Sequence, residues 1–259
     1  MSNKLLLCES DLGVARLTLN RPDQFNALSE ELLAELQVAL DGIAADASIR
    51  AVVIAGAGKA FCAGHDLKQM RANHGKDYMQ RLFRQCGKMM TTIMRMPQPV
   101  IARVHGIATA AGCQLVASCD LAVVADSARF AVSGINVGLF CSTPAVALSR
   151  NMGRKQALEM LLTGDFIDAA EAQRRGLVNR VVAVDQLDAE VRRLTESISG
   201  KSAAAVAMGK QLFYRQLDMG LDAAYQLAAE TMACNMMCED AGEGIDAFMA
   251  KRKPIWKGC

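Results

Sequence analysis

The sequence predicts an α/β protein with a parallel sheet, and three short apolar runs carry this prediction. They are AVVIAGAG at 51–58, PVIARVHG at 99–106 and LAVVAD at 121–126. Runs without polar alternation are typical of strands that are buried on both faces of a parallel sheet. A helical or small-residue segment separates each run from the next, and parallel strands need such crossover connections. The order of the segments therefore favours an α/β architecture.

Other elements follow from periodicity and from end signals. Residues 14–20 (VARLTLN) alternate apolar with polar side chains and stop before a proline, which predicts a strand. Ser29 precedes two acids and a leucine stripe at helical spacing, which predicts an N-capped helix. After residue 154 three amphipathic helices are expected, the first two closed by glycine, in KQALEMLLTG, DAAEAQRRG and DQLDAEVRRLTESIS.

The segment after Ser202 has a helical pattern almost throughout and is rich in Met and Ala. A Met-rich helical surface is more often core or subunit interface than a cofactor site, because the flexible thioether fills irregular apolar gaps. We therefore expect two parts: an α/β core over 1–199, and a helical C-terminal subdomain over 200–259 that caps the core or forms trimers.

Composition excludes several classes of protein. A formal charge of +2, from 29 basic and 27 acidic side chains, provides no basic field for a nucleic-acid partner. The apolar run near the start is too short for a signal peptide, and no run approaches the roughly 20 residues of a membrane span. Nine cysteines without metal-ligand spacing and three histidines indicate neither a metal site nor a disulfide framework. We expect a cytoplasmic protein without a membrane span.

Five stretches of the chain form a recognisable set of motifs, in this order: LNRPDQFNALS (19–29), KAFCAGHDLKQM (59–70), VHGIATAAGCQLVASCDLAVVADSARFAVSGINVGLF (104–140), LTGDFIDAAEAQRRGLVNRVV (162–182) and the terminal FMAKRKPIW. Together they resemble the enoyl-CoA hydratase/isomerase, or crotonase, superfamily. The resemblance covers nearly the whole chain, and within the superfamily it is nearest to the enoyl-CoA hydratase domain-containing subgroup with GHDL and NVGLFCSTP. It implies a ClpP-like spiral of ββα turns and a C-terminal helical region that assembles homotrimers or dimers of trimers. The implied ligand is an acyl-CoA thioester, with no metal and no redox cofactor.

The resemblance assigns an oxyanion hole to the backbone N–H groups of His65 and Ala111. Chemistry next to a thioester carbonyl builds negative charge on its oxygen, and two fixed donors stabilise that charge. Ala111-Gly112 also opens an apolar segment that is typical of a helix start. Many relatives have three glycines where this chain has Ala110-Ala111-Gly112. From spacing alone, a plain strand-to-helix turn explains the same small residues equally well.

For the CoA moiety, the resemblance implies a channel lined by Ala63, Asp66, Leu67 and Lys68. Lys251 or Lys253 would reach the phosphates across a subunit interface, or else would be solvated surface charges. A position after RPDQ that is often basic in relatives is Phe25 here, so one phosphate contact is missing.

The acids of a hydratase are missing at the positions that the resemblance gives them. The two glutamates that activate water match Gln114 and Gly134, and a third acidic position used by some isomerases matches Ser142. An amide orients water but transfers no proton, and each proton-transfer role contributes roughly 10²–10⁴ in rate. Asp120 and Asp126 belong to strand and turn structure in this family.

Further residues lie at or beside the pocket positions. The GHD sequence at His65, together with Asn136, is similar to the branch that decarboxylates methylmalonyl-CoA, although the family needs only the backbone of His65. Cys113 and Cys141 lie beside the pocket positions, where buried cysteines are usually inert. The expected substrate-binding residues also include Gly112, Gly134, Asn136 and Cys141.

Two functions remain open at this point. The first is an enzyme that stabilises a thioester enolate, by decarboxylation or by slow hydratase or isomerase chemistry. The second is a non-catalytic acyl-CoA-binding or assembly protein. Restoring both acids, as Gln114→Glu with Gly134→Glu, is expected to raise hydration.

Overall fold

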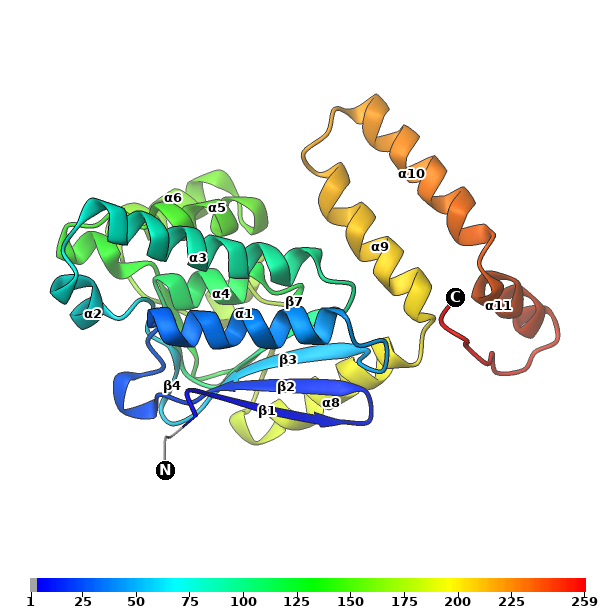
Figure 1. The fold of residues 1–259 in the computed structure, drawn as a ribbon, viewed down its shortest axis with the longest axis horizontal. Coiled ribbons are helices and arrows are strands. Elements are labelled where there is room, and N and C mark those ends of the chain that lie inside the picture. The colour runs from blue at the N-terminus through cyan, green and yellow to red at the C-terminus, as the bar shows by residue number, and fades with distance from the viewer. Residues whose placement is uncertain (1–3) are drawn as a thin grey trace.

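A six-stranded sheet forms the centre of the protein in the computed structural model, which describes residues 4–259 (Figure 1). Only β1 is antiparallel to its neighbour; all other neighbouring strands are parallel. The three apolar runs of the sequence are β3, β5 and β7, which confirms the prediction of buried parallel strands. The strand order is β1 (Leu6–Asp11), β2 (Val14–Leu19), β3 (Ala51–Gly56), β5 (Val100–Val104), β7 (Leu121–Ala125) and β10 (Arg180–Val182).

A second, smaller sheet has four short strands: β4 (Ala60–Cys62), β6 (Ile107–Thr109), β8 (Arg129–Ala131) and β9 (Ile167–Asp168). The first three are parallel, and each directly follows a strand of the large sheet. The chain therefore repeats a unit of two strands followed by helices, which is the ββα spiral that the resemblance implied. The sequence did not predict this sheet, because strands of two or three residues carry no periodicity.

Helices cover the sheets, and most of those expected are present. Ser29 caps α1 by accepting a hydrogen bond from the Leu32 amide at 3.3 Å, as its position predicted. Gly164 and Gly176 lie in the left-handed region just after α6 and α7, where glycine is favoured. The helices of this part are α1 (Glu30–Ala44), α2 (Leu67–Ala72), α3 (Lys76–Arg95), α4 (Ala111–Ser118), α5 (Ser142–Asn151), α6 (Arg154–Thr163), α7 (Ala169–Arg174) and α8 (Leu187–Ser199), with short 3-10 turns η1 (Pro22–Gln24), η2 (Ser133–Val137) and η3 (Val184–Gln186).

The C-terminal segment is helical, as predicted, and projects from the α/β part as an arm (Figure 1). It consists of α9 (Ala203–Gln216), α10 (Leu221–Met236) and α11 (Glu239–Met249). Many of its large apolar side chains are exposed, including Phe213, Tyr225, Met237 and Phe248. Between residues 4 and 259, no helix combines the length and the apolar composition that a membrane span requires.

A buried ion pair fastens the arm to the rest of the chain. Lys210 Nζ lies 2.7 Å from Asp120 Oδ2, and the two side chains are only 6% and 13% exposed. Lys210 also donates to the carbonyl oxygens of Ile93 and Gln98, both at 2.8 Å. Asp120 accepts from the Tyr214 hydroxyl at 2.8 Å and from the Val100 amide at 2.6 Å. Asp120 thus has a structural role, as expected for this position.

Lys210→Met is expected to lower the free energy of unfolding by about 3 kcal/mol, because it leaves Asp120 buried without its counter-ion. Tyr214→Phe removes one hydrogen bond to a charged group and should cost about 1.5 kcal/mol. Chemical denaturation measures both. Lys155→Met, at an exposed position of α6, is the matched control and should stay within about 0.5 kcal/mol of the parent. Equal losses in the two lysine variants would contradict a buried ion pair.

Candidate active site

Two backbone segments that are far apart in sequence touch at the ends of β4 and β6. A Cβ atom added to Gly112 would lie 2.1 Å from the Cys62 carbonyl oxygen, so only glycine fits there. A Cβ on Gly64 would lie 3.2 Å from the Ala111 amide nitrogen. The residue that precedes His65 is therefore packed against the Ala111 amide. This places the two predicted oxyanion-hole residues side by side.

The direction of the His65 amide follows from its pairing with Leu28. Leu28 donates to the Gly64 carbonyl at 2.7 Å and accepts from the Asp66 amide at 3.2 Å, in a parallel bridge. In such a bridge the N–H of the middle residue, here His65, points away from the strand to which its two neighbours are bonded, here the strand of Leu28. Ala111 is the first residue of α4, where an amide has no partner within its helix. Neither amide donates a hydrogen bond to any of residues 4–259.

Ala110 holds the Ala111 amide in place with a strained backbone. Its φ of 50° and ψ of −121° belong to a region that glycine adopts and alanine rarely does. The Ala110 amide donates to the Ala131 carbonyl, and its own carbonyl accepts from the Gln114 amide, both at 3.0 Å. Strain of this kind costs on the order of 1–3 kcal/mol and persists only where the surroundings enforce it.

The two positions that match the hydratase glutamates differ in their surroundings. Gln114 is 4% exposed, and its Oε1 is buried without a hydrogen-bond partner among the described residues. At Gly134 an added Cβ would lie 2.7 Å from both Cys141 Sγ and the Leu139 carbonyl oxygen. A glutamate at position 134 therefore needs the loop at 139–141 to shift, so this backbone opposes the expected gain in hydration from Gly134→Glu, which stays a prediction.

Asn136 and Ser142 follow Gly134 in the sequence, in the region of η2 and the start of α5. The Ser142 hydroxyl, at the first residue of α5, is exposed and donates to the Phe140 carbonyl at 3.3 Å. The Asn136 amide lies against Gly164, where an added Cβ would be 3.0 Å from both of its polar atoms. Neither side chain carries a proton-transfer group that could replace a glutamate.

The His65 imidazole is uncharged near neutral pH. Burial lowers its pKa to about 4, and the nearby Leu28 backbone offsets this only in part. The ring contacts Phe83 edge-on, at 5.3 Å between centroids, and neither ring nitrogen has a hydrogen-bond partner within residues 4–259. The part of His65 that the geometry makes available is its backbone amide.

Asp66 is the only carboxylate in the segments 62–70, 109–118 and 130–145, and it is already engaged. It caps α2 by accepting from the amides of Lys68 and Gln69, both at 3.1 Å, and it pairs with Arg21 at 2.8 Å. Burial raises the pKa of the Asp66 carboxyl, but Arg21 and the two amides outweigh this and hold it below its usual value. The ionised carboxylate of Asp66 thus stabilises the loop that leads into α2.

The remaining residues of the predicted CoA channel surround this loop. Leu67 and Lys68 are exposed, and the Ala63 amide donates to the carbonyl of Phe25, which is itself exposed and left-handed. Lys251 and Lys253 follow α11 in the sequence. The helices α11 and α2 lie at opposite ends of the molecule (Figure 1). Within one subunit they are therefore remote from the site, so a phosphate contact from them requires a second subunit.

The thiols beside the site are poor nucleophiles. Burial raises the pKa of Cys113 to about 12 and also raises the pKa of Cys141. All nine cysteines are free. No group of three or more His, Cys, Asp or Glu within the described range could hold a metal ion.

Asn26 of the motif at 19–29, and the pair Thr109 and Ser133, have structural roles that the sequence did not reveal. Asn26 is fully buried, accepts from the Arg21 amide at 2.9 Å and donates to the carbonyls of Ala57 and Ala60 at 2.8 Å. Near the site, the hydroxyls of Thr109 and Ser133 share a hydrogen bond of 2.8 Å that joins β6 to η2. Long-range polar contacts of this kind leave no local signal in a sequence.

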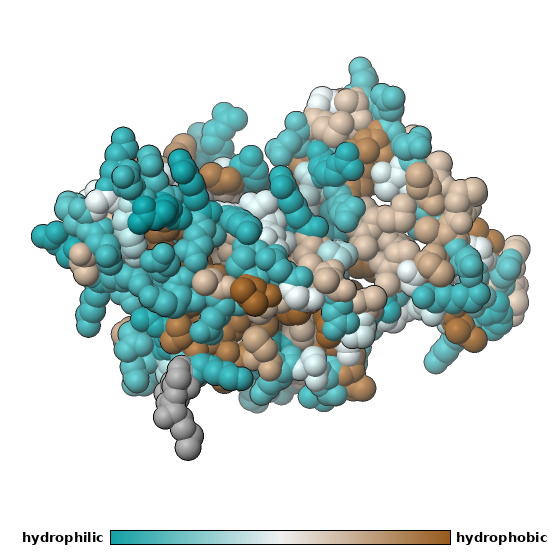
Figure 2. Space-filling model, in the orientation of Figure 1, coloured by the Kyte–Doolittle hydropathy of each residue, from teal (hydrophilic) through white to brown (hydrophobic). Residues whose placement is uncertain are grey.

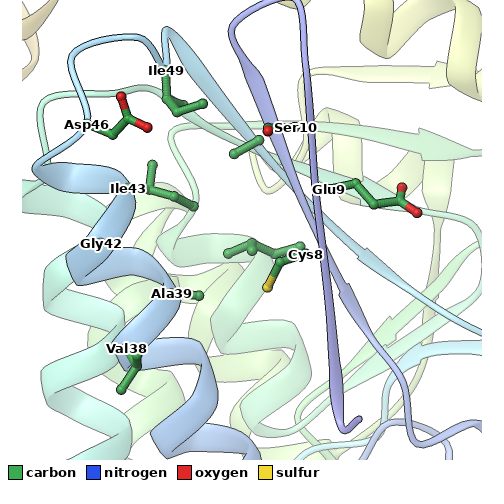
Figure 3. A pocket seen from close by; sticks show the side chains of 11 residues that line it. Cys8, Glu9, Ser10, Val38, Ala39, Gly42, Ile43, Asp46 and Ile49 are labelled. Atoms are coloured by element: carbon green, nitrogen blue, oxygen red, sulfur yellow. The ribbon is translucent and has the colours of Figure 1, made fainter.

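Two hollows of the described structure lie away from this site. One, of about 300 Å³, lies between β1 and α1; the Cys8 sulfur faces the helix there, while Glu9 points away (Figure 3). Partial burial raises the pKa of the Cys8 thiol. The other lies where the arm joins the rest of the chain.

Ala110→Gly is expected to raise the free energy of unfolding by about 1 kcal/mol, because glycine adopts the observed φ and ψ without strain. The neighbouring Ala111→Gly serves as the control: it changes a helical residue and should give no gain. Thermal or chemical unfolding measures both. A loss of stability in Ala110→Gly would mean that this backbone is not strained.

Comparisons with known proteins agree with the fold and with the motifs. The profile of the enoyl-CoA hydratase/isomerase family matches residues 9–259. The chain is 47% identical over 252 residues to "Enoyl-CoA hydratase domain-containing protein 3, mitochondrial" of Xenopus laevis, covering 97% of this chain and 86% of that protein. It is 36% identical to a probable enoyl-CoA hydratase of Rhizobium meliloti, covering 99% of each.

Solved structures give the same result. A crystal structure of an enoyl-CoA hydratase from Mycobacterium smegmatis matches with a TM-score of 0.97 and 61% identity, over 98% of this chain and 99% of that one. The human enoyl-coenzyme A hydratase domain-containing protein 3 matches with a TM-score of 0.95 and 44% identity, over 98% and 100%. The vertebrate relatives are described as mitochondrial, which does not fit the plain cytoplasmic location expected from the sequence. The motif-based resemblance is confirmed, and the chain belongs to the enoyl-CoA hydratase/isomerase, or crotonase, family.

Proposed function

We propose that the protein acts on an acyl-CoA thioester by stabilising an enolate, without a carboxylate that transfers protons. The observation that carries the proposal is the pair of unpartnered amides at His65 and Ala111, which are packed side by side. Donors fixed in advance stabilise a developing oxyanion more effectively than water does. The names of the relatives, which refer to enoyl-CoA hydratases, support a CoA thioester as substrate.

Decarboxylation is the reaction that needs least from this set of residues. In a thioester with a carboxylate on its α-carbon, the bond between the α-carbon and the carboxylate breaks and CO₂ leaves. The electron pair moves to the α-carbon and the thioester oxygen, where the two amides stabilise it. A solvent proton then adds to the α-carbon. No general base takes part, so the absence of glutamate at Gln114 and Gly134 does not prevent the reaction.

Hydration and isomerisation fit the site less well. Both need a group that accepts or delivers a proton at the α- or β-carbon. Gln114 can orient a water molecule through its amide, and Asp66 is committed to Arg21 and to the start of α2. Such reactions would be slow here. A non-catalytic acyl-CoA-binding or assembly role is the outcome if no turnover is found.

We further propose that the arm assembles the chain into homotrimers, or dimers of trimers. The support is the apolar surface that α9, α10 and α11 expose, part of which is visible in Figure 2. A surface of this size is unusual on an isolated soluble subunit. Assembly would also bring Lys251 and Lys253 near the CoA channel of a neighbouring subunit. The exposed apolar side chains include Phe213, Leu217, Leu221, Tyr225, Met232, Met237, Phe248 and Met249.

The purified protein is expected to release CO₂ from malonyl-CoA or methylmalonyl-CoA above the spontaneous rate. Hydration of crotonyl-CoA should fall several orders of magnitude below that of a relative with two glutamates, since each missing role contributes roughly 10²–10⁴. Product chromatography measures both reactions. Hydration at the rate of the two-glutamate relative would contradict the proposal, and absence of every turnover would favour the binding role.

Ala111→Pro tests the oxyanion hole directly. Proline at the first position of a helix removes the N–H donor, and its fixed φ suits a helix start. The rate of whichever reaction is found should fall by about 10²–10³. The matched control is Arg154→Pro, at the exposed first position of α6, which should leave the rate unchanged. Circular dichroism checks that both variants fold, and an unchanged rate in a folded Ala111→Pro protein would rule out this donor.

A further inference from the structure

The second hollow, of about 390 Å³, lies where the α/β part, the arm and the C-terminal segment meet. Its walls come from the end of α1, from the segment before β5, from α8 and α9, and from residues 256–258. Small apolar side chains such as Ala44, Ala204 and Ala207 form much of its surface. Its size is within the range of small-molecule sites, which are mostly apolar with a few polar groups.

Gln98 contributes a buried acceptor that no described residue satisfies. The side chain is 6% exposed, and its Nε2 donates to the carbonyls of Ile43 at 2.8 Å and Asp46 at 3.2 Å. Because two carbonyl oxygens require a donor, these bonds fix which end of the amide is nitrogen. The Oε1 atom therefore points elsewhere, and it is buried without a hydrogen-bond partner among residues 4–259. An unpaired buried acceptor favours a ligand that brings a donor.

Arg50 contributes the positive charge. Its Nη2 donates to the Lys201 carbonyl at 2.6 Å. The guanidinium forms no salt bridge within residues 4–259, and its charge is one of the causes that lower the pKa of the Asp240 carboxyl, which accepts from the Lys257 and Gly258 amides. Arginine presents five N–H donors in a planar fork, so most of them stay available. The other cation of the hollow, Lys257, is already paired with Glu239 at 2.7 Å. Arg50 is thus the group suited to an anion.

Trp256 contributes an aromatic wall that is held in place. Its indole N–H donates to the Gly200 carbonyl at 2.8 Å, which anchors the C-terminal segment beside the start of α9. It is the single tryptophan of the chain. A fixed aromatic ring is a favourable contact for an apolar ligand, and its fluorescence reports on a single position beside this hollow.

We propose that this hollow binds a small amphipathic anion. The apolar body of the ligand packs against the alanines and Trp256, an N–H or O–H group donates to Gln98 Oε1, and a carboxylate or sulfonate accepts from Arg50. The ligand contacts the α/β part, the arm and the C-terminal segment at once. Its binding therefore stabilises their junction, through residues that are separate from the thioester site.

The test uses 8-anilino-1-naphthalenesulfonate, which combines an aromatic body, one N–H donor and a sulfonate. Titration into the full-length protein should quench the emission of Trp256 in a saturable way. N-benzoylglycine, which has an amide N–H and a carboxylate, should displace the probe. Arg50→Met should weaken the affinity by about ten-fold, the loss expected for a hydrogen bond to a charged group. Ala204→Phe should abolish the quenching by filling the hollow.

The matched control is Arg84→Met, which removes an exposed arginine of α3 and should leave the affinity unchanged. Thermal unfolding checks that each variant is folded. The proposal is overturned if the folded Arg50→Met and Ala204→Phe proteins bind the probe like the parent, because the probe then lies on the exposed apolar arm. It is also overturned if Trp256 emission does not respond. Neither result depends on whether the protein turns over a thioester.

Discussion

The contact between Gly112 and the Cys62 carbonyl is the constraint on which the site depends. Cys62 and Ala108 are paired residues of the parallel strands β4 and β6, so the chain leaves both strands at the same edge. The two backbones approach closely there because a glycine stands at each contact, Gly112 against the Cys62 carbonyl and Gly64 against the Ala111 amide. The amides of His65 and Ala111 are brought together by this close approach. A side chain at either glycine would force the segments apart and separate the two donors.

The sequence predicted those elements whose signals are local. The strands β3 and β7 are apolar over six and five residues, β5 is apolar except for Arg103, and α1 has its cap and its leucine stripe. The helix α3 was not among the expected elements, although its buried residues Leu82, Cys86, Met89 and Ile93 follow helical spacing. The strands of the small sheet were missed because pairing between strands, and not their own composition, defines them.

For the site, the sequence predicted the positions of key residues but not the contacts that those residues make. Motif positions located His65, Ala111, Gln114 and Gly134, and the structure places the first two together. The motif could not reveal that Cys141 and Leu139 fill the space in front of Gly134, since that depends on how the loop after η2 folds back. It also could not reveal that Asp66 is held by Arg21, a contact between residues 45 positions apart.

The buried helix α4 lies between the Ala111 amide of the site and the ion pair that fastens the arm. Its eight residues span about 12 Å, with the Ala111 amide at one end and Asp120, the partner of Lys210, two residues beyond the other. All eight are buried, and a close-packed interior transmits displacement instead of absorbing it. The helix therefore acts as a rigid strut. A displacement of α9 that keeps its ion pair would be passed to this strut, and a shift of the strut along its axis moves the donor at its other end.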